Sequence, residues 1–344
     1  MFRRPRRPTA LLVALPLLLA GCASAAAPGP GPGTGTPGRA VTASAEPATG
    51  TPTGAPTEAA APPAAPPTVA ATPVLDSAND QPLPLDAYLF NPAQMSTVAK
   101  AQAKLVTGCM ARLGFTYAPP TPAEPARGTD APTTRTDGRY GPQDATVMAT
   151  WGYHPQGGDT GPGAVPPPPQ LSPQMTTALR GSSDPKQKFG PGGQAVNGRT
   201  VPDHGCVGEA LRTLTGAVDG RVGDAQLAED LKFRTLHDSQ QDARTQAVFA
   251  QWSQCMKESG FDYRDPIAAM GDKAWPATPA PTPHEIQVAT ADAACRHRTN
   301  LVGVWYSVDH AYQQQAVAEN ATAMARIKTA LQTQVDAATA ALNG

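Results

Sequence analysis

Motifs that carry chemistry are scarce in this chain of 344 residues. It has no G-x-S-x-G nucleophile elbow, no glycine loop ending in G-K-[ST] and no H-E-x-x-H pair. These absences remove the common signatures of serine hydrolases, nucleotide-binding loops and zinc peptidases. We therefore expect a protein that is not an enzyme, with no catalytic residues, no cofactor and no metal.

The chain also has few basic residues and no long apolar run. Four of the 27 lysines and arginines precede Cys22, so the chain from Cys22 onward has 23 of them against 28 acidic residues, a net charge near −5. Nucleic acids and anionic lipids bind basic surfaces, so we expect neither as a partner. The longest apolar run, Leu11–Ala20, is too short to span a bilayer as a helix. No segment alternates β-branched residues, so little or no sheet is expected.

The N-terminus has the features of a bacterial export signal in the right order. Four arginines lie among the first seven residues, the apolar run follows, and the tetrad Leu19-Ala20-Gly21-Cys22 ends it. The tetrad resembles a lipobox, in which the cysteine thiol is diacylated and becomes the mature N-terminus. Residues 1–21 are therefore predicted to be a lipoprotein signal peptide, and diacylglyceryl Cys22 to anchor the chain to the cell membrane. The alternative is an ordinary cleavable signal with an incidental cysteine.

Such a signal places the mature chain outside the cytoplasm, on the outer face of the bacterial cytoplasmic membrane. Residues 22–85 are dominated by Pro, Ala, Thr and Gly. This composition has too little apolar bulk to offset its ordering entropy, so a disordered tether is expected. The tether would lift a folded head off the membrane. Drifted low-complexity sequence with no length requirement predicts the same disorder.

The remainder is predicted to be all-α, a disulfide-stapled helical head with internal duplication. Residues 86–216 are assigned to helical repeat one, which a Pro/Gly-rich insertion interrupts at about 118–202, and residues 217–344 to helical repeat two. Periodic apolar positions predict helices at 92–113, 206–214, 224–259 and 283–342. The last starts with a capping box at Thr282-Pro283-His284-Glu285 and is long. A bend near Gly303 or Asn320, or a hairpin against the third helix, would accommodate it.

A nine-residue motif occurs twice in the head. Its two copies share Cys, Met, Gly, Phe and Tyr at identical offsets, as Cys109, Met110, Gly114, Phe115 and Tyr117 and as Cys255, Met256, Gly260, Phe261 and Tyr263. If each glycine is the left-handed residue after a helix, the phenylalanine contacts the methionine, as in a Schellman ending. The motif thus predicts a helix end with a structural cysteine one turn before it. The alternative is a reactive thiol, which needs a nearby base.

With Cys22 lipidated, four cysteines remain, an even number in an oxidising compartment. Disulfides are the expected outcome, and four cysteines allow three connectivities. Because each motif copy is followed by one further cysteine, duplication favours Cys109–Cys206 and Cys255–Cys295. A zinc site is the alternative, although no pair has C-x-x-C spacing.

The insertion also contains aromatic residues around a short apolar piece at Val147-Met148. We expect one or two helical turns there, within a long loop of the kind that often carries function. A binding surface is predicted on this loop, formed by Tyr140, Trp151, Tyr153 and His154. A hydrolase would instead need two of the histidines to converge in the fold, from the set His154, His204, His297 and His310.

Three segments together resemble a loosely defined group of actinobacterial secreted lipoproteins of unknown function. They are the repeated C-M-x-x-x-G-F-x-Y motif, Asp203–Ala210 and Asn300–Val308. The resemblance implies an accessory protein of the cell envelope, working beside an exporter of the ABC type, and it implies no catalytic residues. The expected function is therefore a non-catalytic, membrane-anchored lipoprotein that contacts an unknown envelope protein. The alternatives are a lipoprotein that binds a small molecule or peptide and, more remotely, a hydrolase.

Overall fold

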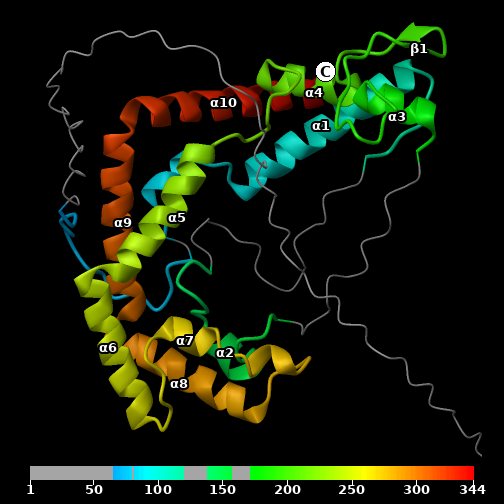
Figure 1. The fold of residues 1–344 in the computed structure, drawn as a ribbon. Helices are drawn as coiled ribbons and strands as arrows, with labels where there is room; N and C mark the ends of the chain where they lie inside the picture. The colour runs from blue at the N-terminus through cyan, green and yellow to red at the C-terminus, as the bar shows by residue number, and fades with distance from the viewer. Residues whose placement is uncertain (1–64, 80, 120–137, 157–170) are drawn as a thin grey trace, which may run out of the picture. The chain divides into compact units, whose positions relative to one another are not determined.

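The computed structural model describes residues 65–79, 81–119, 138–156 and 171–344. The chain divides into two units, Met1–Pro62 and Pro63–Gly344, and all described residues belong to the second (Figure 1). The predicted signal peptide, Cys22 and residues 23–64 of the predicted tether lie outside the described residues. Residues 120–137 and 157–170 of the predicted insertion do so too.

Helices dominate the described residues, which confirms the predicted all-α class. The longer ones are α1 (Pro92–Arg112), α4 (Gly205–Thr215), α5 (Gln226–Gln241), α6 (Ala243–Glu258), α8 (Pro283–Thr299), α9 (Leu301–Glu319) and α10 (Ala321–Asn343). The shorter ones are η1 (Pro84–Tyr88), α2 (Ala145–Trp151), α3 (Pro173–Arg180), α7 (Pro266–Met270) and η2 (Trp275–Ala277). Strands in the described part are limited to an antiparallel pair, β1 (Ala195–Val196) with β2 (Arg199–Thr200), in the register Ala195↔Thr200.

Side-chain caps determine where two of the predicted helices begin. The Asn91 side chain accepts the Gln94 N–H at 2.8 Å, the Gln94 side chain accepts the Asn91 N–H at 3.0 Å, and Pro92 occupies the first turn of α1. The Thr282 hydroxyl accepts the Glu285 N–H at 3.1 Å, which confirms the predicted start of α8. Each cap satisfies backbone donors that have no partner within the helix.

The two longest predicted helices are interrupted at polar residues. The stretch 283–342 forms three helices, which meet at Asn300 and Asn320. The bend expected at Asn320 is confirmed, whereas the one expected near Gly303 lies at Asn300, which has a φ of 51°, a left-handed value that asparagine tolerates. The stretch 224–259 forms α5 and α6, because Asp242 adopts an extended backbone and caps α6 by accepting the Arg244 N–H at 2.9 Å.

Both motif copies end their helices as the sequence predicts. Gly114 and Gly260 have φ values of 85° and 89°. The Phe115 N–H donates to the Met110 carbonyl, and the corresponding bond in the second copy has the same length, 2.9 Å. Together with the glycine N–H bonds at 3.0 Å, this is the Schellman pattern.

The two disulfides have the connectivity that duplication favours. Cys109–Cys206 joins α1 to α4 and Cys255–Cys295 joins α6 to α8, with Cα–Cα distances of 5.5 and 5.6 Å. All four cysteines are buried. The motif cysteine is therefore a cross-link between two helices of the same copy, and the zinc and reactive-thiol alternatives are wrong.

Three apolar clusters form the core, and they do not divide at the repeat boundary. One surrounds Trp252 and Trp305, a second lies between α1, α5 and α10, and a third joins α1 to α3 and α4. The last helix, α10, packs along α1 and α4 (Figure 1). The boundary predicted at residue 216 thus separates two copies of a motif that share one folded unit.

The predicted tether ends earlier than residue 85. Residues 65–79 and 81–88, here called the strap, hydrogen-bond to the helical body. The Leu75 N–H donates to Asn300 Oδ1 at 3.0 Å and the Leu85 N–H to Gln313 Oε1 at 3.1 Å. Ala78 and Leu85 are almost fully buried. The prediction was wrong here because a few apolar residues in a proline-rich stretch suffice when helices offer a surface and side-chain acceptors.

Candidate functional site

Of the four residues predicted to form a binding surface, Tyr140 and His154 are buried, which corrects the prediction for these two, and Trp151 and Tyr153 are half-buried. Tyr140 is fully buried, and its hydroxyl donates to Asp309 Oδ2 at 2.8 Å. Trp151 and Tyr153 are half-buried, and the Tyr153 ring stacks on Trp275 with centroids 5.6 Å apart. Aromatic side chains with one polar end are common at binding surfaces, but they also anchor a segment to a core that offers the matching acceptor.

His154, the fourth residue, is buried between two acceptors. Its Nδ1 lies 2.8 Å from Glu285 Oε1, and its Nε2 lies 2.9 Å from the Thr278 carbonyl oxygen. Gly152 allows this close approach, since a Cβ on it would lie 2.6 Å from the same Glu285 oxygen. Both ring nitrogens are therefore used within the fold.

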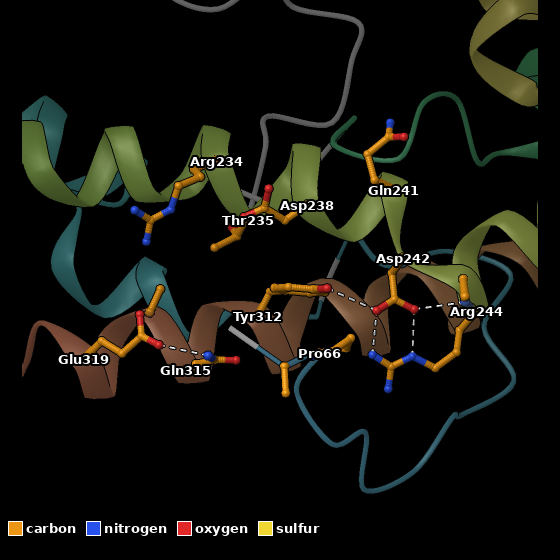
Figure 2. A pocket seen from close by; sticks show the side chains of 13 residues that line it. Pro66, Arg234, Thr235, Asp238, Gln241, Asp242, Arg244, Tyr312, Gln315 and Glu319 are labelled. Carbon is orange, nitrogen blue, oxygen red and sulfur yellow. Dashed lines mark hydrogen bonds and ion pairs between the residues drawn. The ribbon is translucent and has the colours of Figure 1, made fainter. Parts of the chain in front are cut away.

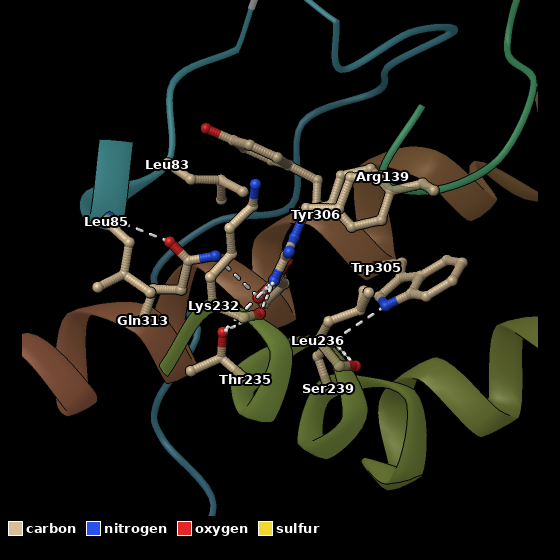
Figure 3. Close-up of polar contacts among 12 residues, drawn as sticks. Leu83, Leu85, Arg139, Lys232, Thr235, Leu236, Ser239, Trp305, Tyr306 and Gln313 are labelled. Atoms are coloured by element: carbon tan, nitrogen blue, oxygen red, sulfur yellow. Dashed lines mark hydrogen bonds and ion pairs between the residues drawn. The ribbon is translucent and has the colours of Figure 1, made fainter. Parts of the chain in front are cut away.

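Three buried carboxylates on α8 and α9 fix the segment that contains α2. Glu285 accepts from the Tyr153 N–H at 2.8 Å, and Asp292 accepts from the Tyr153 hydroxyl at 3.0 Å. Asp309 accepts from Arg139, which also donates to the Lys232 carbonyl at 2.7 Å (Figure 3). All three carboxylates are fully buried.

These contacts also suppress the acidity of the tyrosines involved. Burial and the charge of Asp309 raise the pKa of Tyr140 well above its ordinary value. Burial and the charge of Asp292 raise the pKa of Tyr153 in the same direction. Both phenols are thus neutral hydrogen-bond donors, which suits a structural role and not that of a base.

The histidines that a hydrolase would require each have a partner of their own. His204 contacts the neighbouring Asp203 at 2.7 Å, His297 pairs with Asp76 of the strap, and His310 packs against the Tyr306 ring. His154 is held in the α2 segment, as above. Burial lowers the pKa of His310, which favours its neutral form. The geometry gives no support to a shared acid–base site.

A different place, between α5 and α9, is hollow. A cavity of about 740 Å³, open to solvent, lies there and is bordered at one end by the first turn of α6 (Figure 2). Two arginines and three carboxylates line it together with neutral polar groups; the set includes Arg234, Thr235, Asp238, Gln241, Asp242, Arg244, Tyr312, Gln315 and Glu319. Ala65 and Pro66, at the start of the strap, form one wall.

Arg244 makes hydrogen bonds to both the helix cap and the strap at this cavity. Its Nε and Nη2 donate to the two carboxylate oxygens of Asp242 at 2.8 and 2.7 Å, and the Tyr312 hydroxyl donates to the same carboxylate at 3.2 Å. The remaining Nη1 donates to the Pro67 carbonyl oxygen at 3.0 Å. Hydrogen bonding from Arg244 holds the pKa of Asp242 below its ordinary value.

Sequence reasoning missed this site because it treated 224–259 as one continuous helix. The break at Asp242 places the first turn of α6 beside the cavity, and the Asp242 side chain that caps α6 also binds Arg244. A signal was present, since aspartate is a favoured N-cap residue and Asp242 precedes the helical apolar positions Phe249 and Trp252.

A second, smaller hollow lies beside the first copy of the duplicated motif. About 250 Å³ remain open beside Ala103, Val106 and Tyr117. At the same offsets from the motif cysteine, copy two has Phe249, Trp252 and Tyr263, and it buries both Phe249 and Trp252. Copy one therefore has less side-chain volume at the positions that fill the core of copy two.

Comparison with known proteins adds no family. No protein-family model matches this sequence, and no curated protein or solved structure matches it either. Within the described ranges, no three or more His, Cys, Asp or Glu side chains are grouped so as to hold a metal ion. None of the helices described is both long and apolar enough to cross a bilayer.

Proposed function

We propose that this protein is a lipid-anchored, extracytoplasmic accessory protein of the bacterial cell envelope that acts through protein contacts and not through catalysis. The arginine-rich start, apolar run and Leu19–Cys22 tetrad support the anchor. The resemblance to secreted actinobacterial lipoproteins supports a place beside an exporter of the ABC type. Each buried carboxylate of α8 and α9 binds residues of its own chain, which supports a structural use of these groups.

The observation that carries a role in protein contacts is the way the α5/α9 cavity binds a main chain. Arg244 donates to a backbone carbonyl of an extended segment that forms one wall of the cavity. Asp242 holds the Arg244 guanidinium in place, so Arg244 loses little side-chain entropy when it binds a carbonyl. This chemistry recognises polypeptide in general.

The anchor is tested by fractionation of cells that produce the full chain. The unaltered protein is expected in the membrane fraction, and Cys22→Ser in the soluble extracytoplasmic fraction, since one cysteine carries the acyl chains. Cys109→Ser is not a suitable control because it breaks a disulfide. An unaltered protein that fractionates as soluble would contradict the anchor.

Contacts through the cavity are tested by photo-crosslinking in intact cells. A crosslinking amino acid at Gln241, an exposed residue that lines the cavity, is expected to capture a defined envelope protein. The matched control is Gln251, which is exposed on α6. Equal capture from both positions, or none from either, would refute contact through this cavity.

The volume of the cavity favours a second candidate, a binding lipoprotein for a small molecule or peptide. A cavity of about 740 Å³ is within the ~300–1,000 Å³ range of ligand sites. A ligand that fills it would raise the melting temperature of the full chain, and Ala243→Trp would abolish that rise by occupying the same space. Screening without any such shift would remove this candidate.

A further inference from the structure

The strap residues at the cavity are an extended segment that contains proline. Ala65 and Pro66 line the cavity, and the next residue, Pro67, offers its carbonyl to Arg244. Proline has no N–H, so a proline-rich strand is recognised through donors to its carbonyls and through flat surfaces for its rings. The cavity has both, since Arg244 supplies the donor and Tyr312 an aromatic ring.

The charged side chains that line the cavity favour an uncharged ligand. The lining holds two arginines, Arg234 and Arg244, and three carboxylates, Asp238, Asp242 and Glu319. Arg244 and Asp242 neutralise each other in a bidentate pair. A strongly charged ligand of either sign would therefore meet repulsion as well as attraction, whereas an uncharged polypeptide meets neither.

The chain itself contains an uncharged Ala/Pro-rich sequence as a tandem repeat. Residues 60–63 and 64–67 both read Ala-Ala-Pro-Pro, and the second unit is the one whose proline carbonyl Arg244 binds. The cavity measures about 740 Å³ beside that segment, so the space is not filled by residues 65–67. An extended strand with the same composition would fit without introducing charge.

We propose that the α5/α9 cavity is a recognition site for an extended, uncharged Ala/Pro-rich segment of another envelope protein, and that residues 65–67 occupy its edge as an internal competitor. The assignment rests on the proposed role in protein contacts and names the partner by its chemistry. Because residues 65–67 belong to the same chain, their effective concentration at the cavity is high. They therefore lower the apparent affinity for the external segment.

The test uses the full chain and a fluorescent peptide with the sequence of residues 60–70. Saturable binding is expected, together with weaker binding of a control peptide in which alanine replaces all four prolines. Arg244→Gln is expected to lower the affinity about tenfold, the effect of one charge-assisted hydrogen bond. The matched control, Arg221→Gln, changes an exposed arginine outside the cavity and is expected to have no effect.

Two further variants separate recognition from misfolding. Ala243→Trp blocks the cavity from an exposed position and is expected to abolish binding while the melting temperature stays unchanged. Replacing Pro66 and Pro67 by glycine loosens the internal competitor and is expected to raise the affinity severalfold.

Equal binding of both peptides, or binding that Ala243→Trp leaves intact, would overturn the proposal. If the full chain self-associates and the peptide dissociates this oligomer, a second copy of the chain fills the site. That result would overturn the assignment to another protein. A partner captured from Gln241 in cells without any peptide binding would refute this inference alone, whereas no capture would refute the broader function.

Discussion

Removing the disulfides one at a time tests whether they act mainly on the unfolded chain. Cys109–Cys206 closes a loop with a sequence separation of 97, and Cys255–Cys295 one of 40. In the chain-entropy estimate these loops contribute about 4.7 and about 3.9 kcal/mol at 25 °C. Loss of the first bridge is therefore expected to destabilise the protein more, by about 0.8 kcal/mol.

The comparison is well matched because all four cysteines are buried to a similar degree, with exposures of 0–3%. The two variants, each with both cysteines of one bridge changed to alanine, lose the same atoms and leave similar cavities. Guanidinium unfolding of each variant under non-reducing conditions gives the free energy of unfolding. The m-value is expected to rise in both, since an unfolded chain without the bridge exposes more surface.

The outcome that would refute this reasoning is a reversed order. If loss of Cys255–Cys295 cost more by over ~1 kcal/mol while both m-values stayed unchanged, contacts in the folded state would outweigh loop entropy. The Trp252–Trp305 core beside that bridge would then be the place to look for the additional energy.

Four further predictions concern the helix ends, the buried Asp309 carboxylate, the acid range and a tyrosine titration. Gly260→Ala is expected to cost about 1–2 kcal/mol from its left-handed φ alone, and Gly114→Ala more, since its added Cβ would lie 2.9 Å from a side-chain amide; denaturant unfolding of both variants checks this. Asp309→Asn is expected to destabilise the fold by about 3–5 kcal/mol, since it leaves a buried arginine without its counter-charge, and thermal unfolding that matches the unaltered chain would disprove this. The pKa of Asp242 is lowered on folding, so the stability it contributes is complete above the ordinary value near 3.8 and declines as the pH falls below it; acid unfolding of Asp242→Asn should lack this component. Burial and a neighbouring carboxylate raise the pKa of Tyr263 to about 12, which ultraviolet titration of the folded chain against Tyr263→Phe would detect.

The parts of the fold that could be predicted are those determined by local geometry. A left-handed glycine after a helix constrains the next few residues, so Met110, Gly114 and Phe115 were enough to define a helix end. Disulfide pairing followed from duplication, because each copy contains one further cysteine. The short helix α3 was missed within the predicted insertion, although Ser172 as a cap, Pro173 in the first turn and Gly181 after the end all signal it.

The break at Asp242 could have been predicted, but the full lining of the candidate site could not, because it depends on contacts between distant segments. The sequence around Tyr140 and His154 favours a surface loop. It gives no sign of the buried carboxylates that bind these residues, which lie 169 and 131 positions later in the chain. Similarly, Pro67 has no local reason to be ordered; its partner, Arg244, is 177 positions later in the chain. Periodicity describes a helix face, but it does not say which segment covers that face.

The strap has a mechanical consequence for any pulling force on the chain upstream of residue 65. Its attachments follow one another along the sequence, from the carbonyl of Pro67 to the N–H of Leu75 and then that of Leu85. A force applied at the upstream end acts first on the Pro67 contact. Each later contact is loaded only after the one before it has broken. Both disulfides come later in the sequence than these attachments, so such a force is expected to expose the α5/α9 cavity before it unfolds the helical body.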